Sequence, residues 1–179
     1  MAHISTLGAG IYTYLDVYTG TVTGGVSSLT SAALFAAEFQ GGTVGTDVLT
    51  MPSIREFPSV GTPANIVNVP VYGQATSSQV QGQADAPSLE ITVNYVPSDM
   101  LDIHDLVGEQ VLFRVMMTQE SLTPAQRNAA TISAANTEFY FVGKIEAILV
   151  NPQLTDATTA TVTLSAQSDF YGPATIAAV

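Results

Sequence analysis

The sequence contains no cysteine, and only four of its 179 residues are lysine or arginine. Without cysteine the chain has no disulfide framework, no thiolate metal site and no thiol nucleophile. The four basic side chains, Arg55, Arg114, Arg127 and Lys144, are scattered along the sequence. Because affinity for duplex nucleic acid comes from clustered lysine and arginine that contact phosphates, ordinary nucleic-acid binding is disfavoured. Binding to an anionic membrane is disfavoured for the same reason.

Long apolar runs are absent as well. No run approaches roughly 18 residues, the length needed to span a bilayer. The segment from Met1 to Ser5 also lacks the basic and apolar parts of a secretory signal. We therefore expect a soluble protein that is made in the cytoplasm.

The sequence is instead rich in acidic and apolar residues. Asp and Glu supply 15 groups, and the formal net charge is -11. Apolar residues make up 46% of the chain, enough for the core of a single domain over residues 1–179. Charged residues make up only 11%, against about 25% in typical soluble domains. Such a surface is typical of a protein that assembles, because a monomer needs charge to remain dispersed.

Alternation of apolar and polar residues predicts a mainly β fold. In the clearest example, Leu89, Ile91 and Val93 alternate with polar residues, which indicates one buried and one solvated face. Similar patterns, or short apolar runs between turn residues, recur along the chain. Strands are expected within residues 11–23, 47–60, 89–95, 111–117, 137–150 and 161–167.

Residues 137–150 form one of these alternating segments. Ala147 and Leu149 fall in its apolar series. Glu138 and Glu146 are interpreted as surface or interface charges near Lys144, because eight residues along one strand separate them too far to share a proton.

One helix, over residues 98–107, has clear start and stop signals in the sequence. Ser98 is a suitable cap, acidic residues occupy the first turn, and Gly108 ends the pattern. Its apolar side chains share one face, which should dock on the sheet. The Ala-rich residues 29–40 fit either a short helix or a strand. We therefore expect an antiparallel β-sandwich or partly closed barrel with one flanking α-helix.

Two long polar loops interrupt the strands, at residues 58–87 and 118–136. Residues 73–87 contain almost no bulky apolar side chain, so this part of the first loop is expected to order only against a partner. Residues 1–10 and 170–179 are expected to form terminal arms.

The richest cluster of titratable side chains shows no catalytic or metal-binding pattern. No adjoining loop supplies the six to eight oxygens that calcium requires. A Gly-x-Ser-x-Gly turn and a phosphate-binding Gly-Lys-Ser/Thr loop are also absent from the sequence. We therefore expect no enzymatic activity and no cofactor. The cluster comprises Asp99, Asp102, His104, Asp105 and Glu109.

Arg55 and Arg114 are the basic residues in the most unusual surroundings. Arg55 lies in a proline-flanked segment, and Arg114 lies inside an apolar strand. A rare cation in a low-charge protein usually has a carboxylate partner. We therefore expect both arginines to form ion pairs, within the subunit or between subunits.

Three features follow one another within about residues 45–170. The proline-punctuated segment Met51–Pro58 leads into the long polar loop, a strand passes into a helix over Ser88–Asp99, and the closing hairpin ends at Val162–Ser168. In this order they resemble the major tail tube proteins of long-tailed bacteriophages, especially those with non-contractile tails.

This resemblance implies hexameric rings stacked into a hollow tube, whose inner wall is a continuous β-barrel made from the sheets of neighbouring subunits. The long loop would reach the adjacent ring, and terminal arms would tie rings together. The implied partners are further copies of the chain, a tape-measure protein in the lumen, and tail terminator and baseplate or tip proteins. Double-stranded DNA would pass through without specific binding. The protein would be made in the host cytoplasm and located in the virion tail.

An acidic wall poor in lysine and arginine agrees with such a conduit, because it repels phosphate. The alternative is a secreted or surface-displayed immunoglobulin-like adhesion module that binds carbohydrate or protein, on which the same polar side chains face solvent. The candidates for lining the lumen are Glu90, Thr92, Asn94, Thr161, Thr163 and Ser165. The candidates for contact between rings are Gln74, Thr76, Ser78, Gln79 and Gln81.

Overall fold

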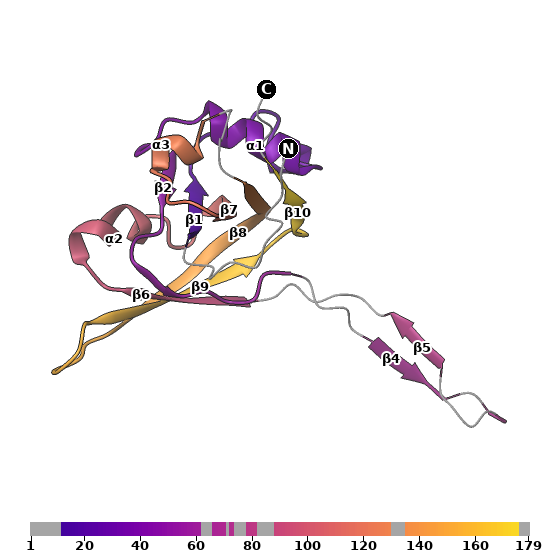
Figure 1. The fold of residues 1–179 in the computed structure, drawn as a ribbon. Coiled ribbons are helices and arrows are strands. Elements are labelled where there is room, and N and C mark those ends of the chain that lie inside the picture. The colour runs from indigo at the N-terminus through magenta and orange to yellow at the C-terminus, as the bar shows by residue number, and fades with distance from the viewer. Residues whose placement is uncertain are drawn as a thin grey trace.

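Eight strands form one curled antiparallel sheet in the computed structural model, and few helices accompany it (Figure 1). The structure describes residues 12–61, 66–70, 72–73, 78–81, 88–129 and 135–175. The sheet curls into a half-barrel, so the mainly β, partly closed architecture expected from the sequence is confirmed.

The strands of this sheet are β1 (Thr13–Tyr18), β2 (Val48–Thr50), β3 (Ile54–Glu56), β6 (Ser88–Asn94), β7 (Gln110–Thr118), β8 (Asn136–Asn151), β9 (Thr159–Ala166) and β10 (Tyr171–Ala174). A separate hairpin consists of β4 (Ile66–Val69) and β5 (Ser78–Gln81). The helices are α1 (Ala32–Gly41), α2 (Pro97–His104), α3 (Pro124–Arg127) and the 3-10 turn η1 (Val26–Ser28).

The strand order explains why the sheet is partly closed. Neighbouring strands follow the path β2-β1-β7-β8-β9-β6-β3, and β10 also pairs with β8. Residues 48–56 contain both ends of this path, because β2 pairs with β1 whereas β3 pairs with β6. One short stretch of chain therefore runs from one end of the sheet to the other.

The main core fills the inside of the curl. The alternating residues of β6 and β9 point into it as expected, and α2 contributes Met100 and Ile103. Phe113 and Phe141 stack at its centre, with ring centroids 5.0 Å apart. The core therefore draws on both halves of the sheet and on α2.

A second core covers part of the outer face. Phe35 and Phe39 of α1 are fully buried against Tyr140 of β8, with ring centroids 5.7 and 5.9 Å from the tyrosine ring. Residues 32–41 are thus helical, which resolves the ambiguity that periodicity left open. Because α1 lies over this half of the sheet, β7 and the first half of β8 are buried on both faces.

A β-bulge in β8 contradicts the expected facing of the strand. The register with β9 shifts between Ile145 and Ala147, so Ala147 lies opposite Thr163 and Leu149 lies opposite Thr161. Both side chains thereby move to the polar face. The prediction that alternate residues continue to face the core was wrong beyond Ile145, because one extra residue reverses the facing of every residue that follows.

Two further expectations are corrected nearby. Glu138 was expected at the surface or at an interface, but it is fully buried within the chain, where α1 and β10 pack against this part of β8. The helix expected over residues 98–107 ends at His104, and Val96 occupies the cap position, with Pro97 in the first turn. Ser98 is therefore inside the helix, where its hydroxyl donates to Asp99 at 2.9 Å.

The long loop and the terminal arms also differ from expectation. Residues 66–69 and 78–81 of the loop pair as a β-hairpin, and Figure 1 shows this hairpin well away from the body. Residues 171–174 are part of the sheet through β10 and do not form a free C-terminal arm, because their backbone pairs with β8. The expected N-terminal arm, residues 1–10, lies outside the described residues.

Gly143 lies at the centre of the sheet, where a substitution can test how tightly the strands pack. A Cβ added there would lie 2.8 Å from the carbonyl oxygen of Ser165 and 3.0 Å from the Phe113 ring. Gly143→Ala should lower the free energy of unfolding by about 1–3 kcal/mol, because the tightly packed strands must shift. Chemical denaturation measures the change. Gly41→Ala is the matched control, since nothing lies within 4 Å of the added Cβ; equal stabilities of the two variants would contradict the prediction.

Candidate functional site

The polar face of β6 and β9 carries all six side chains that the sequence proposed for the lumen. In the register of these strands Glu90 lies opposite Thr163, and Thr92 lies opposite Thr161. Asn94 and Ser165 extend the same face at its two ends. Glu90 is exposed and the others are partly buried, so the structure brings the six together on one surface.

The bulged half of β8 continues this surface, hereafter called the bare face (the side chains of residues 88–94, 144–151 and 159–165 that point away from the main core). Its charged groups are Glu90, Glu146 and Lys144, and the Ser165 hydroxyl donates to Glu146 at 2.6 Å. The rest of the bare face is mostly neutral and polar. It therefore carries a small acidic excess and no cluster of basic groups.

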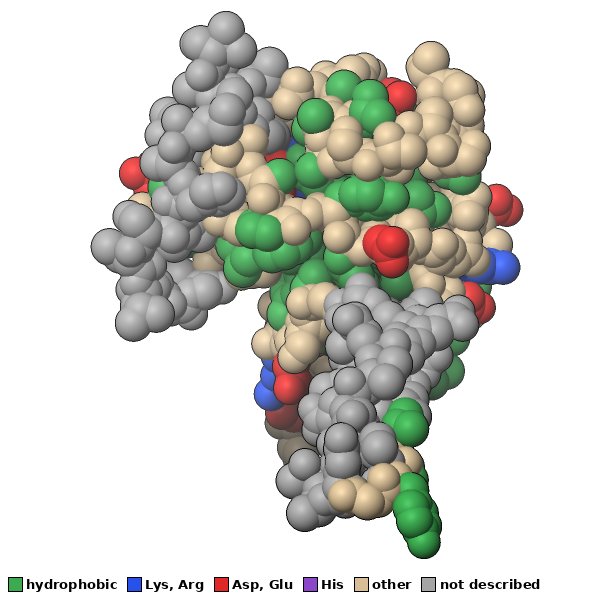
Figure 2. All heavy atoms as spheres, turned by 90° about the vertical axis from the view of Figure 1, so that its right-hand side faces the viewer, with side chains coloured by type: hydrophobic (Ala, Val, Ile, Leu, Met, Phe, Trp, Pro, Cys, Tyr) green, Lys and Arg blue, Asp and Glu red, His purple; other side chains and the backbone are tan. Residues whose placement is uncertain are grey.

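Figure 2 shows the molecule from one side, looking toward the β4–β5 hairpin. Neutral polar and apolar side chains dominate this view, with scattered acidic groups and few basic ones. Such a surface offers polyanions little attraction.

A buried ionic network lies under the covered half of the outer face. Asp16 of β1 accepts hydrogen bonds from two arginines: Arg114 of β7 at 2.7 Å and Arg127 of α3 at 2.9 Å. The Thr50 hydroxyl of β2 donates to Asp16 at 2.7 Å. Both arginines are at most 2% exposed. One carboxylate thus links three strands and a helix.

Aromatic rings and a second carboxylate complete this network. The guanidinium of Arg114 lies 4.6 Å from the centroid of the Phe39 ring, and that of Arg127 lies 4.1 Å from the Tyr14 ring. On the neighbouring strand, Glu138 accepts hydrogen bonds from the Tyr140 hydroxyl and, at 2.6 Å, from the Asn136 amide. The network, hereafter the arginine network (Asp16, Thr50, Arg114, Arg127, Asn136, Glu138 and Tyr140), contains two cations and two carboxyl groups.

Burial and charge act in opposite directions on its two carboxyl groups. Burial raises the pKa of Asp16, but Arg114 and Arg127 outweigh that effect and hold the pKa below its ordinary value. Burial also raises the pKa of Glu138, and there the hydrogen bonds and the charge of Arg114 do not compensate. Asp16 is therefore held in its ionised form, whereas Glu138 retains its proton more readily than a free carboxyl group.

The two arginines singled out in the sequence have different surroundings. Arg114 forms the expected ion pair, and its partner belongs to the same subunit. Arg55 is exposed, and within the described ranges no ion pair involves it. Sequence reasoning missed Arg127, although it follows a capping box at Thr123 and Gln126 that fixes α3 in place.

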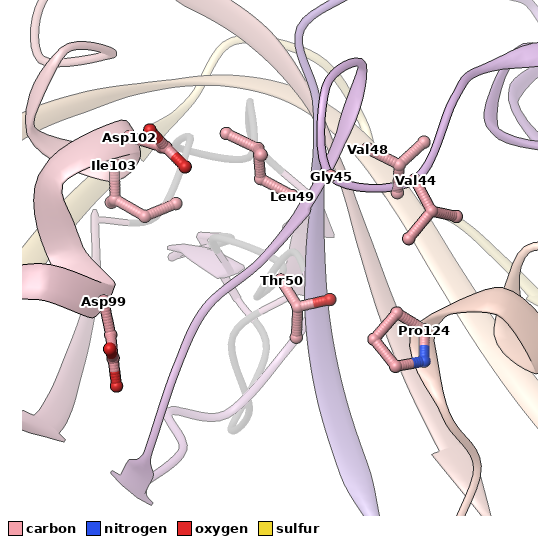
Figure 3. A pocket seen from close by; sticks show the side chains of 9 residues that line it. All are labelled: Val44, Gly45, Val48, Leu49, Thr50, Asp99, Asp102, Ile103 and Pro124. Carbon is pink, nitrogen blue, oxygen red and sulfur yellow. The ribbon is translucent and has the colours of Figure 1, made fainter.

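The acidic side chains around α2 spread over the helix and the turn that follows it, within residues 99–109. In the described ranges no three His, Asp or Glu side chains are grouped to hold an ion. Asp99 and Asp102 border an open pocket of about 200 Å³ between α2 and β2, with Leu49 and Ile103 among its apolar walls (Figure 3). His104 contacts the hydroxyl of Tyr95 at 3.4 Å. These contacts supply no nucleophile paired with a base.

Of the candidates for contact between rings, Ser78, Gln79 and Gln81 belong to β5. Gln74 and Thr76 lie outside the described residues.

No family model matches the sequence, and no curated protein matches it. Among the described residues no helix combines the length and the apolar character needed to cross a bilayer.

Removing one cation from the arginine network should be strongly destabilising. Arg114→Met leaves Asp16 buried with one of its two charged partners, and breaking a buried pair typically costs about 3–5 kcal/mol. Urea denaturation of the purified variant measures this loss. Arg55→Met changes an exposed arginine and should stay within about 0.5 kcal/mol of the wild type. A small effect at Arg114 would show that the network contributes little.

The raised pKa of Glu138 predicts a specific pH dependence. The native protein binds this proton more tightly than the unfolded chain, whose carboxyl titrates near 4.5. The resulting stabilisation is complete below pH 4.5. It is lost as the pH rises through the raised pKa that Glu138 has in the folded protein. Glu138→Gln abolishes this titration.

The free energy of unfolding of Glu138→Gln, minus that of the wild type, should therefore increase between about pH 4 and pH 7. Urea titrations across this range measure it, and parallel curves for the two proteins would contradict the assignment. The titration of Asp16 does not interfere with this measurement, because the pKa of Asp16 is lowered. The stabilisation that Asp16 contributes is lost only as the pH falls below 3.8.

Proposed function

We propose that this chain is the tube-forming subunit of a bacteriophage tail, a structural protein that stacks as hexameric rings around a conduit for the genome. The observation that carries the proposal is the division of the outer face of the sheet. One half is covered by α1 and the arginine network, whereas the bare face is polar and weakly acidic. A tube needs this combination: subunits with a rigid body and a wall to which DNA does not adhere.

Burial of two arginines supports the proposal on electrostatic grounds. Arg114 and Arg127 are withdrawn from the surface, which leaves Arg55 and Lys144 as the basic side chains accessible to a cargo. Phosphate binding depends on several neighbouring cations that displace counterions. On the bare face Lys144 is accompanied by two glutamates, so DNA has no basic track to bind.

The β4–β5 hairpin supports assembly. It forms a sheet of its own and extends away from the body (Figure 1). An isolated two-stranded hairpin is at best marginally stable in water, so it requires a partner surface. In the proposed tube that surface belongs to the adjacent ring. The tape-measure protein would occupy the lumen, and the tail terminator and the baseplate or tip proteins would close the two ends.

Deleting residues 74–84 tests this role of the hairpin. The deletion removes β5 but no residue of the main sheet, so the variant should remain a folded, soluble monomer that no longer polymerises. Circular dichroism checks the fold, and negative-stain microscopy of variant and wild type checks for tubes.

Tubes formed by the deletion variant would refute the inter-ring role of the loop. Wild-type protein that remains monodisperse at high concentration would refute the tube itself and favour the adhesion module.

A further inference from the structure

The far end of the β8–β9 hairpin carries large apolar side chains in solvent. Leu149 is 60% exposed, Val150 38% and Leu154 fully exposed. Figure 1 shows this end of the hairpin extending beyond the rest of the sheet. Single exposed apolar side chains are ordinary, but three within six residues at a projecting end indicate a contact surface.

In the part of the chain that the structure describes, one backbone edge at this end is also unpaired. Pairing between β7 and β8 ends at Gln110 and Lys144. Beyond Glu146, β8 pairs with β9 on one side, and no strand in the described ranges pairs with its other edge. An edge strand with free N–H and C=O groups is a template for contact with another chain.

The charge distribution indicates what that other chain is. The nine residues from Ala147 to Thr155 contain no charged side chain, although the whole chain has a formal net charge of -11. Residues 57–84, which contain the β4–β5 hairpin, are uncharged as well. Two copies of an acidic protein repel each other, so they approach at least cost through surfaces that carry no charge. A polyanion or a basic peptide would gain no electrostatic attraction here.

We infer that the end of the β8–β9 hairpin, residues 147–155, is a contact surface for a second copy of this chain. This inference rests on the proposed function and extends it by naming the apolar residues, Leu149 and Leu154, that the second copy covers. In a stack of rings these side chains lie at the edge of the bare face, where one subunit meets the next.

The critical concentration for polymerisation tests the inference. Purified full-length wild type and the variant Leu149→Thr/Leu154→Gln are assembled over a concentration series, and polymer is separated by sedimentation. The variant should require at least tenfold more protein, which corresponds to about 1.4 kcal/mol per added subunit. Leu34→Gln is the matched control, because Leu34 is also exposed, at 44%, but lies on α1; it should change the critical concentration less than twofold.

Each result supports or overturns the inference. An unchanged critical concentration for the double variant, or an equal increase for Leu34→Gln, overturns it while leaving the proposed tube intact. Wild type that never polymerises overturns both. Thermal melting checks folding, and if the double variant melts early, Leu154→Gln alone gives the answer, because Leu154 is fully exposed and contributes little to the core.

Discussion

The bridge that Asp16 makes between Arg114 and Arg127 is the interaction on which the outer face of this protein depends. Arg114 belongs to β7 and Arg127 to α3, so the carboxylate ties the loop after β7 back onto the sheet. Thr50 brings in β2 through the same group. A buried ion pair is weak evidence for net stability, because desolvation offsets the attraction. The bridge instead fixes positions: it holds Arg114 against Phe39 of α1 and Arg127 against Tyr14 of β1.

This arrangement divides one sheet into two chemically different surfaces. Where α1 and α3 lie, both faces of the sheet are buried and charges occur in compensated groups. Over β6, β9 and the end of β8 no element covers the outer face in the described part of the chain, and most of its side chains are polar. The buried half can hold the bare half in a fixed curvature, as the proposed tube wall would require.

The β strands were predictable wherever one face of the sheet is buried and the other is exposed to solvent. On β6 and β9, Leu89, Ile91, Val162 and Leu164 are buried as their alternation indicates, because solvent contacts one face only. The same reasoning failed on β8. Glu138 is polar yet buried, because a distant helix covers it, and Leu149 is apolar yet exposed, because a bulge reverses the strand. Neither cause leaves a local trace in the sequence.

By itself, the sequence determined the mainly β class, the two cleanest strands, the scarcity of positive charge and the expectation that Arg114 has a carboxylate partner. These properties follow from local periodicity and composition, which do not depend on how the chain folds back on itself. Only the tertiary structure decided which carboxylate that is and which half of the sheet remains bare. Asp16 and Arg114 are 98 residues apart along the chain. Contacts over such separations are set by strand order and helix placement, and these emerge only when the whole core packs together.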